Sequence, residues 1–151
     1  MKPVTRRTFV LAAGAAALWS ATGLPAQAAS ETLELWKTPW CGCCTAWVDH
    51  MREAGFDVRV TELEDLEPLK ARLGVAPELA SCHTGLIGGY VVEGHVPAAD
   101  VARLLKEKPD ATGLAVSGMP IGSPGMEMDG RTDAYEVVLF APGGNTVFAS
   151  Y

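Results

Sequence analysis

Apolar and polar residues alternate in some segments of the chain and follow a helical period in others. Residues 32–37 alternate, which predicts a strand, and residues 38–43 then form a turn. From Cys44 the apolar residues recur at positions i, i+3, i+4 and i+7, which predicts a helix that ends near Gly55. Residues 56–63 alternate again and predict a second strand.

The middle of the chain predicts a short helix, two short strands and another helix. Asp65 can cap the short helix. We expect a loop over residues 75–83 and two strand pieces within residues 85–96, with their turn at Glu93-Gly94. Pro97 is typical of the start of a helix, so a third helix should follow it.

The last third of the chain predicts a long loop and a hairpin. Residues 113–130 are rich in glycine and proline, and loops of this length in a compact domain are usually functional or disordered. Residues 135–141 and 146–151 flank a Pro-Gly-Gly-Asn turn and predict a terminal hairpin. The order of elements therefore predicts an α/β fold, a mixed sheet flanked by helices, with an added methionine-containing loop and a C-terminal β-hairpin.

The N-terminus has the pattern of an export signal. The pair Arg6-Arg7 precedes an apolar stretch over residues 9–19, and residues 26–28 read Ala-Gln-Ala, which suits signal cleavage. We expect a signal peptide over residues 1–28, of the twin-arginine type, and a single folded domain over residues 29–151 in the periplasm. An ordinary secretory signal or an uncleaved anchor is the alternative.

Composition and charge narrow the classes of partner. The chain is 48% hydrophobic and 20% charged, which is typical of a globular protein. Removal of residues 1–28 leaves nine basic and eighteen acidic residues, and this balance argues against a nucleic-acid partner. No later segment is apolar enough to cross a bilayer, so the mature chain should have no membrane span.

The four cysteines carry the main chemical signal. Cys41 and Cys44 form a C-x-x-C motif where a strand passes into a helix, and the positive end of the helix dipole favours thiolates there. Cys43 lies between them, although a dithiol oxidoreductase needs only two thiols. Cys82 is distant in sequence, and we expect its loop to pack against this turn and to complete a four-sulfur site.

Such a site allows two interpretations. Thiolate clusters select soft metal ions, Cu(I) first and Zn(II) next, so the four cysteines predict a metal centre. The alternative is two disulfides, for example Cys41–Cys44 and Cys43–Cys82, which would require the adjacent Cys43 and Cys44 side chains to point in different directions.

The sequence offers further soft ligands besides the cysteines. Met119, Met126 and Met128 lie in the glycine- and proline-rich loop, and a thioether suits Cu(I) far better than Zn(II). The simpler interpretation is that these methionines pack the loop against the core. We expect at least one of them to reach the metal region.

The three histidines have different expectations. His83 follows Cys82 directly and can bind metal from the same loop, or it can be a surface or capping residue. His50 lies on a different face of the first helix from Cys44, and His95 lies in an apparent turn before Pro97. We do not expect His50 or His95 to be ligands.

Several motifs together resemble known families. Residues 40–44 (Trp-Cys-Gly-Cys-Cys) resemble the Trp-Cys-Gly-Pro-Cys motif of thioredoxins. Residues 38–44, 81–84, 89–97 and 119–128 together resemble CopG, a family of small exported proteins linked to bacterial copper resistance.

The CopG resemblance implies a thioredoxin-like fold with extra elements, and a copper site. It suggests a cysteine-bridged, multinuclear Cu(I) cluster at Cys41, Cys43, Cys44 and Cys82, redox cycling of copper, and other periplasmic copper-handling proteins as partners. One departure from thioredoxins is that no proline immediately precedes Thr84.

Three functions follow from these residues. The first is copper binding for resistance or redox conversion. The second is thiol-disulfide exchange, with Cys41 as the nucleophile and Cys44 as the resolving thiol. The third is a structural zinc domain held by the four cysteines.

Overall fold

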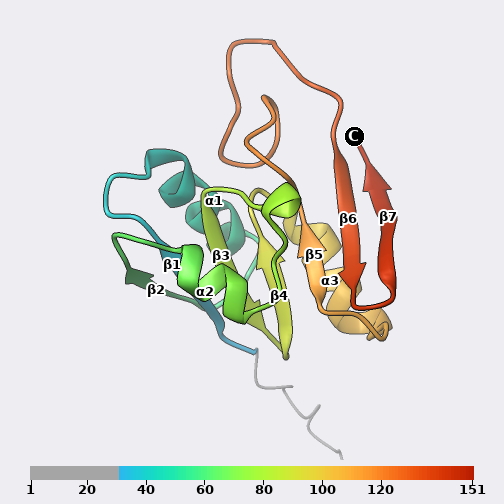
Figure 1. Cartoon of the computed structure of the whole chain (residues 1–151). Coiled ribbons are helices and arrows are strands. Elements are labelled where there is room, and N and C mark those ends of the chain that lie inside the picture. The colour runs from blue at the N-terminus through green and yellow to red at the C-terminus, as the bar shows by residue number, and fades with distance from the viewer. Residues whose placement is uncertain (1–30) are drawn as a thin grey trace, which may run out of the picture.

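A computed structural model describes residues 31–151, and the expected signal peptide lies outside this part of the chain. Seven strands form one sheet in the order β2-β1-β3-β4-β5-β6-β7 (Figure 1). In chain order the elements are β1 Leu33–Lys37, α1 Gly42–Glu53, β2 Val58–Glu62, α2 Glu67–Arg72, the 3₁₀ turn η1 Pro77–Leu79, β3 His83–Ile87, β4 Tyr90–Glu93, α3 Ala98–Glu107, β5 Gly113–Ala115, β6 Glu136–Ala141 and β7 Gly144–Ser150.

The first four strands and three helices have a thioredoxin-like topology. Strands β1 and β2 are parallel, as a βαβ unit requires, and β3 is antiparallel to both β1 and β4. Strands β5, β6 and β7 then extend the sheet beyond β4, where β5 is parallel to β4 and the β6–β7 pair is an antiparallel hairpin. The predicted mixed sheet with a terminal hairpin is confirmed.

The two faces of the sheet differ in what covers them. Leu35 of β1 packs in one core cluster with Trp47 of α1 and Leu104 of α3, so both helices cover the same face. A smaller apolar cluster, which includes Leu79 and Phe140, lies apart from it and receives residues of the α2–β3 connection. No helix of residues 31–151 is long and apolar enough to cross a membrane.

Several predicted element boundaries were wrong. The first helix begins at Gly42 rather than Cys44, because Cys41 serves as its N-cap. The turn between β3 and β4 lies at Gly88-Gly89 rather than Glu93-Gly94. Both glycines have positive φ (58° and 83°), which a two-residue turn between twisted antiparallel strands favours.

The predicted loop over residues 113–130 was too long, because its first three residues form β5. Gly113 is required there, since a Cβ atom would overlap the carbonyl of Val91 on the neighbouring strand β4. The rest of the segment is irregular and returns toward the start of α1. A Cβ atom at Gly125 would come within 2.8 Å of the carbonyl oxygen of Cys43.

Candidate metal centre

The three-cysteine turn is shaped by the start of α1. The Cys41 sulfur accepts a hydrogen bond from the backbone N–H of Cys44 (3.3 Å), which satisfies one of the free donors at the helix start. Cys41 and Cys44 form a disulfide, and Cys43 remains a free thiol with its sulfur 3.5 Å from that of Cys41. Cys44 is fully buried, whereas Cys43 is partly accessible.

Strand pairing brings Cys82 to this turn. Strands β1 and β3 are antiparallel with Lys37 opposite His83, so the segment after β1 meets the segment before β3. The sulfur of Cys82 lies 3.8 Å from that of Cys43, and all four cysteine sulfurs lie within 4.8 Å of one another. The expected meeting of a distant sulfur with the three-thiol turn is what the structure shows, while metal binding by the four cysteines stays a prediction.

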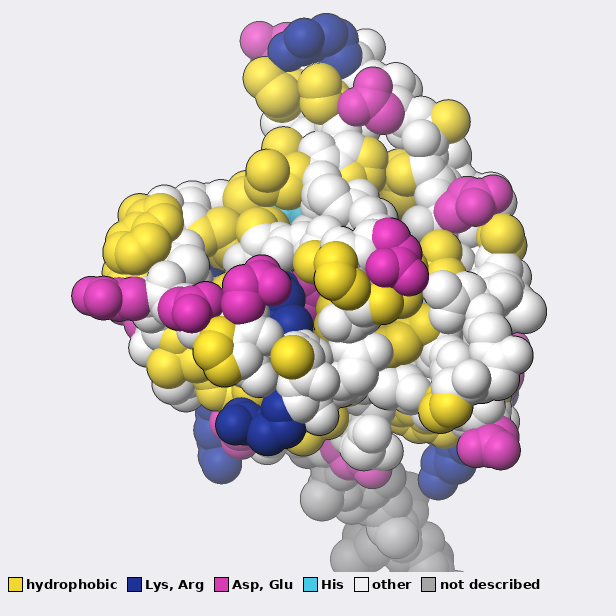
Figure 2. Space-filling view, in the orientation of Figure 1, with side chains coloured by type: hydrophobic (Ala, Val, Ile, Leu, Met, Phe, Trp, Pro, Cys, Tyr) yellow, Lys and Arg dark blue, Asp and Glu magenta, His cyan; other side chains and the backbone are white. Residues whose placement is uncertain are grey.

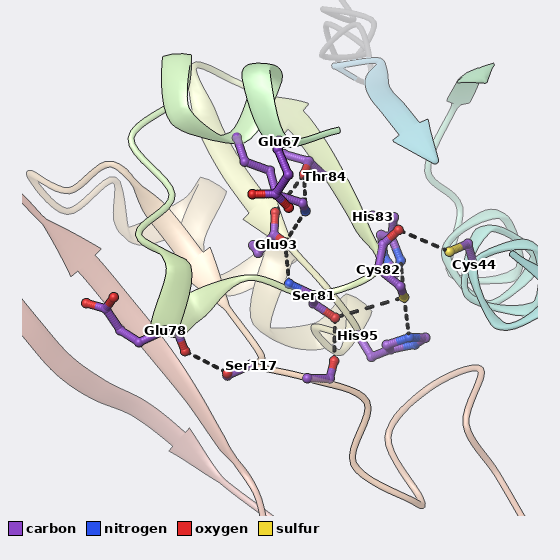
Figure 3. Close-up of polar contacts among 12 residues, drawn as sticks. Cys44, Glu67, Glu78, Ser81, Cys82, His83, Thr84, Glu93, His95 and Ser117 are labelled. Atoms are coloured by element: carbon purple, nitrogen blue, oxygen red, sulfur yellow. Dashed lines mark hydrogen bonds and ion pairs between the residues drawn. The ribbon is translucent and has the colours of Figure 1, made fainter. Parts of the chain in front are cut away.

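His95 also reaches the site, contrary to the sequence interpretation. Its Nε2 atom lies 3.1 Å from the Cys82 sulfur (Figure 3), and its Nδ1 atom lies 2.8 Å from the carbonyl oxygen of Pro124. Since a carbonyl can only accept, Nδ1 carries the proton of the neutral ring, and the Nε2 lone pair is directed at the sulfur. His95 therefore has the tautomer that a metal ligand needs.

The misplaced turn explains why His95 was missed. With the turn at Gly88-Gly89, Thr84 pairs with Glu93, and the same register continued two residues outward along the two strands brings Cys82 close to His95. The two adjacent glycines were the sequence signal that could have given this register.

His83 lies at the centre of the site. It is completely buried, its Nδ1 atom is 3.4 Å from the Cys82 sulfur, and its ring lies 4.5 Å from that of Trp47. Its Nε2 atom has no hydrogen-bond partner. Burial lowers the pKa of His83 well below the ordinary value, and burial also lowers the pKa of His95. Both rings are therefore uncharged at neutral pH, and each has a nitrogen lone pair that can bind a metal ion.

His50 has no part in this cluster, as expected. Its Nε2 atom accepts a hydrogen bond from the backbone N–H of Ala98 (3.1 Å), at the first residue of α3. His50 therefore supports a helix start rather than the cysteine cluster.

One of the three predicted methionines lies at the cysteines. The thioether of Met119 is 3.9 Å from the Cys43 sulfur, and this side chain is 52% exposed. The sulfur of Met128 instead lies 3.8 Å from the guanidinium of Arg131, and Met128 is 47% exposed. Within residues 31–151, neither Met126 nor Met128 makes a sulfur contact with a cysteine, so Met119 is the thioether that the structure places at the site.

The site is desolvated at Cys82 and open at the turn. Burial, together with the neighbouring Cys43, raises the pKa of Cys82 to about 12, so its thiol is protonated at neutral pH until a cation replaces the proton. Trp40, beside the cluster, is 71% exposed. Figure 2 shows exposed apolar side chains and acidic side chains together on one face of the molecule.

The family model DUF411, described as a protein of unknown function, matches residues 79–126. No curated protein matches the chain.

Two solved structures match nearly their whole length. Copper resistance protein CopG, form 2, is 46% identical with a TM-score of 0.77, over 80% of this chain and 98% of that chain. Form 1 is 47% identical with a TM-score of 0.76, over 80% of this chain and 96% of that chain. Identity at this level over almost the whole of both relatives shows that this chain belongs to the CopG family.

Proposed function

We propose that this chain is an exported copper-binding protein that holds Cu(I) in the periplasm for copper resistance or redox conversion. The observation that carries the proposal is the convergence of four cysteine sulfurs within 4.8 Å, from two distant segments of the chain. The names of the two related structures, which describe copper resistance proteins, support copper as the metal.

The donor set fits Cu(I) better than Zn(II). Thiolates and thioethers are soft ligands, and a thiolate can bridge two ions, so Cys41, Cys43, Cys44 and Cys82 can hold more than one copper. Met119 supports copper over a structural zinc domain, because a thioether is a poor zinc ligand. The neutral rings of His83 and His95 are further candidate ligands at the buried side of Cys82.

The Cys41–Cys44 disulfide gives the site a means of redox conversion. Its reduction takes two electrons and two protons and yields two thiols, so it can accept one electron from each of two Cu(I) ions, which become Cu(II). The reverse direction closes the disulfide, releases two protons and returns two Cu(II) ions to Cu(I). Copper therefore enters this reaction as the substrate.

Location and partners are part of the same proposal. The signal pattern of residues 1–28 supports export, and the twin-arginine pair suits a protein that folds before export. Copper ions, and other periplasmic copper-handling proteins that deliver or receive them, are the proposed partners.

The test uses residues 29–151, reduced and handled without oxygen, and titrated with Cu(I) against a chromophoric chelator. The wild type should retain at least one Cu(I) per chain, and Cys41→Ser and Cys44→Ser should each lose it, because each removes a sulfur from the cluster. Unchanged copper content in both variants would eliminate the site. Metal analysis of untreated protein separates copper from zinc.

A second candidate function is thiol-disulfide exchange. The observation that favours it is the disulfide at the start of α1, next to the exposed Trp40. Against it, Cys82-His83 stands where thioredoxins place a proline, and Cys43 adds a third thiol. Reduction of insulin by the copper-free protein, with sustained turnover, would favour exchange over copper binding.

A further inference from the structure

A buried ion pair lies across the sheet from α1, next to the segment that carries Cys82. Lys70 of α2 and Glu93 of β4 are in direct contact, and both side chains are almost completely buried. Thr84 of β3 closes the network, because its hydroxyl accepts from the Lys70 ammonium (2.9 Å) and donates to Glu93 Oε2 (2.7 Å). Both charges are therefore partnered within the interior.

The carboxylate of Glu93 also binds the backbone next to a cysteine of the site. Its Oε1 atom accepts a hydrogen bond from the backbone N–H of Ser81 (2.6 Å), the residue immediately before Cys82 (Figure 3). Charge-assisted bonds of this kind are among the stronger hydrogen bonds in proteins. The position of the Cys82 backbone is thus tied to a buried carboxylate.

Ser81 extends this connection to the loop over residues 116–130, which carries Met119 and is called the methionine loop below. Its hydroxyl donates to the carbonyl of Gly118, the residue before Met119, and the N–H of Gly118 binds the carbonyl of Ala80 (3.2 Å). Gly94 allows this close approach, since a Cβ atom there would lie 2.6 Å from the Cβ of Ser81. The segments that carry Cys82 and Met119 are therefore bound to each other through Ser81.

We propose that Glu93, held by Lys70, is a positioning residue that sets the places of the Cys82 and Met119 sulfurs through Ser81. The inference deepens the proposed function and rests on it, because it names residues that shape the copper centre without touching copper. The Cys82 and Met119 sulfurs both face Cys43, at 3.8 Å and 3.9 Å.

A copper site built from several sulfur ligands requires each sulfur to be held in place. Sulfurs from three separate segments must meet within metal-ligand distance, and groups that orient metal ligands strongly affect metal affinity. A buried ion pair is a weak source of stability, because apolar residues of similar volume often replace such a pair without loss. A role in placing the Cys82 segment therefore explains this pair better than a role in stability.

The test compares three variants with the wild type. In Lys70→Met/Glu93→Leu both charges are removed together, so no unpaired charge is buried, and the acceptor for the Ser81 N–H is lost. In Lys70→Met/Glu93→Gln the charges are removed but an oxygen remains to accept from Ser81. In Ser81→Ala the hydroxyl bonded to Gly118, which also lies 3.9 Å from the Cys82 sulfur, is removed, while the bond from the Ser81 N–H to Glu93 remains.

Ser117→Ala is the matched control. It removes a hydroxyl of the same loop whose hydrogen bond goes to the carbonyl of Glu78 (2.7 Å), away from the cysteines. Cu(I) affinity is measured by chelator competition, and the sulfur ligands of copper are counted by X-ray absorption. The second measurement responds to ligand placement and not to a uniform loss of stability.

We expect Lys70→Met/Glu93→Leu to bind Cu(I) roughly tenfold to a hundredfold more weakly, with fewer sulfur neighbours per copper. Ser81→Ala should lose the Met119 contribution, Lys70→Met/Glu93→Gln should recover most of the affinity, and Ser117→Ala should match the wild type. If the Leu variant does not fold, Ser81→Ala still tests whether the sulfurs are placed through Ser81, and wild-type affinity with an unchanged sulfur count in that variant overturns the proposal.

The two failures are distinguishable. Absence of Cu(I) binding by the wild type would overturn the proposed function. Binding by the wild type, together with equal affinity and equal sulfur count in Lys70→Met/Glu93→Leu and Ser81→Ala, would overturn only the positioning role of Glu93.

Discussion

The protonation state of His95 determines whether its ring can bind a metal ion at the buried side of the site. The bond from His95 Nδ1 to the carbonyl of Pro124 leaves Nε2 without a proton and facing the Cys82 sulfur. Burial lowers the pKa of His95, which keeps the ring neutral at neutral pH. A neutral ring with a fixed lone pair next to a thiol is suited to share a metal ion with that thiol.

We expect His95→Asn to weaken Cu(I) binding roughly tenfold or more, because a ligand and its oriented lone pair are lost. His50→Asn is the control, since His50 binds only the start of α3 in this region. Chelator competition on reduced protein measures both variants. Equal losses in the two variants would show that His95 acts through general stability and not as a ligand.

At this scale the sequence predicted the sulfurs better than the nitrogens. Three cysteines in four residues are a dense local signal, whereas His95 reaches Cys82 only through the register of β3 and β4. Met119 could not be separated from Met126 by sequence, because the path of an irregular loop depends on contacts such as that of Gly125 with α1.

The methionine loop and α1 are joined by a close backbone contact. Gly125 has a φ of 84°, and a Cβ atom there would lie 2.7 Å from the backbone nitrogen of Trp47. The loop therefore needs glycine for two reasons, the positive φ and the absence of a side chain. This contact holds the loop beside the helix start that carries the cysteines.

Gly125→Ala should destabilise the oxidised protein by about 2–4 kcal/mol, from the strain of the positive φ and the overlap with α1. Gly130→Ala is the matched control, because Gly130 also has a positive φ (64°) but has no atom within 4 Å of an added Cβ. Its cost should be only about 1–2 kcal/mol. Urea unfolding measures both, and equal midpoints would contradict a tight loop–helix contact.

At the scale of elements, alternation and helical spacing located the long elements and missed two short ones, the 3₁₀ turn η1 and strand β5. Strand β5 has only three residues, Gly113–Ala115, and such a short run cannot show an alternating pattern. It forms because β4 offers a free edge to which it can pair in parallel. The start of α1 was misplaced by two residues, since cysteine is an unusual N-cap and was not recognised as one.

The added hairpin joins the sheet through the pairing of β6 with β5, and side chains of α3 hold its C-terminal end. The hydroxyl of Tyr151 donates to Asp100 (2.7 Å), and Arg103 lies 3.6 Å above the ring of Phe148 and donates to its carbonyl (2.6 Å). The rings of Tyr151 and Tyr135 stack at 5.0 Å. The contacts with Asp100 and Arg103 join the C-terminal end of the sheet extension to α3.

This attachment should weaken in alkali. Burial and the bond to Asp100 raise the pKa of Tyr151 to about 12, and the neutral phenol is the form that bonds. Its contribution to stability is therefore complete below about pH 10, the unfolded value, and is lost as the pH rises toward 12. Tyr151→Phe should show a smaller loss of unfolding midpoint over this range, and an identical pH profile in both proteins would refute the attachment.

For the whole molecule, the predicted topology followed from the order of elements, whereas the redox state of the site did not. Sequence reasoning left metal binding and two disulfides as alternatives, because four thiols in one place permit both. The structure contains one disulfide, Cys41–Cys44, and leaves Cys43 and Cys82 as free thiols. In this state two of the four sulfurs are joined in a disulfide and cannot act as thiolate ligands.

The copper capacity of the protein should therefore depend on its thiol state. Oxidised protein, with two free thiols, offers Cys43 and Cys82 beside Met119 and the histidines, and reduced protein offers all four thiolates. We expect reduced protein to retain Cu(I) against the chelator and protein with the disulfide intact to lose it, as Cys41→Ser and Cys44→Ser do. Copper and free thiols are counted on the same sample, and Cys41→Ser/Cys44→Ser, which cannot form the disulfide, is the control.

This variant should match the oxidised wild type whether or not reductant is present. Equal copper content in reduced and oxidised wild type would show that Cys41 and Cys44 are not ligands and that the disulfide does not control copper binding.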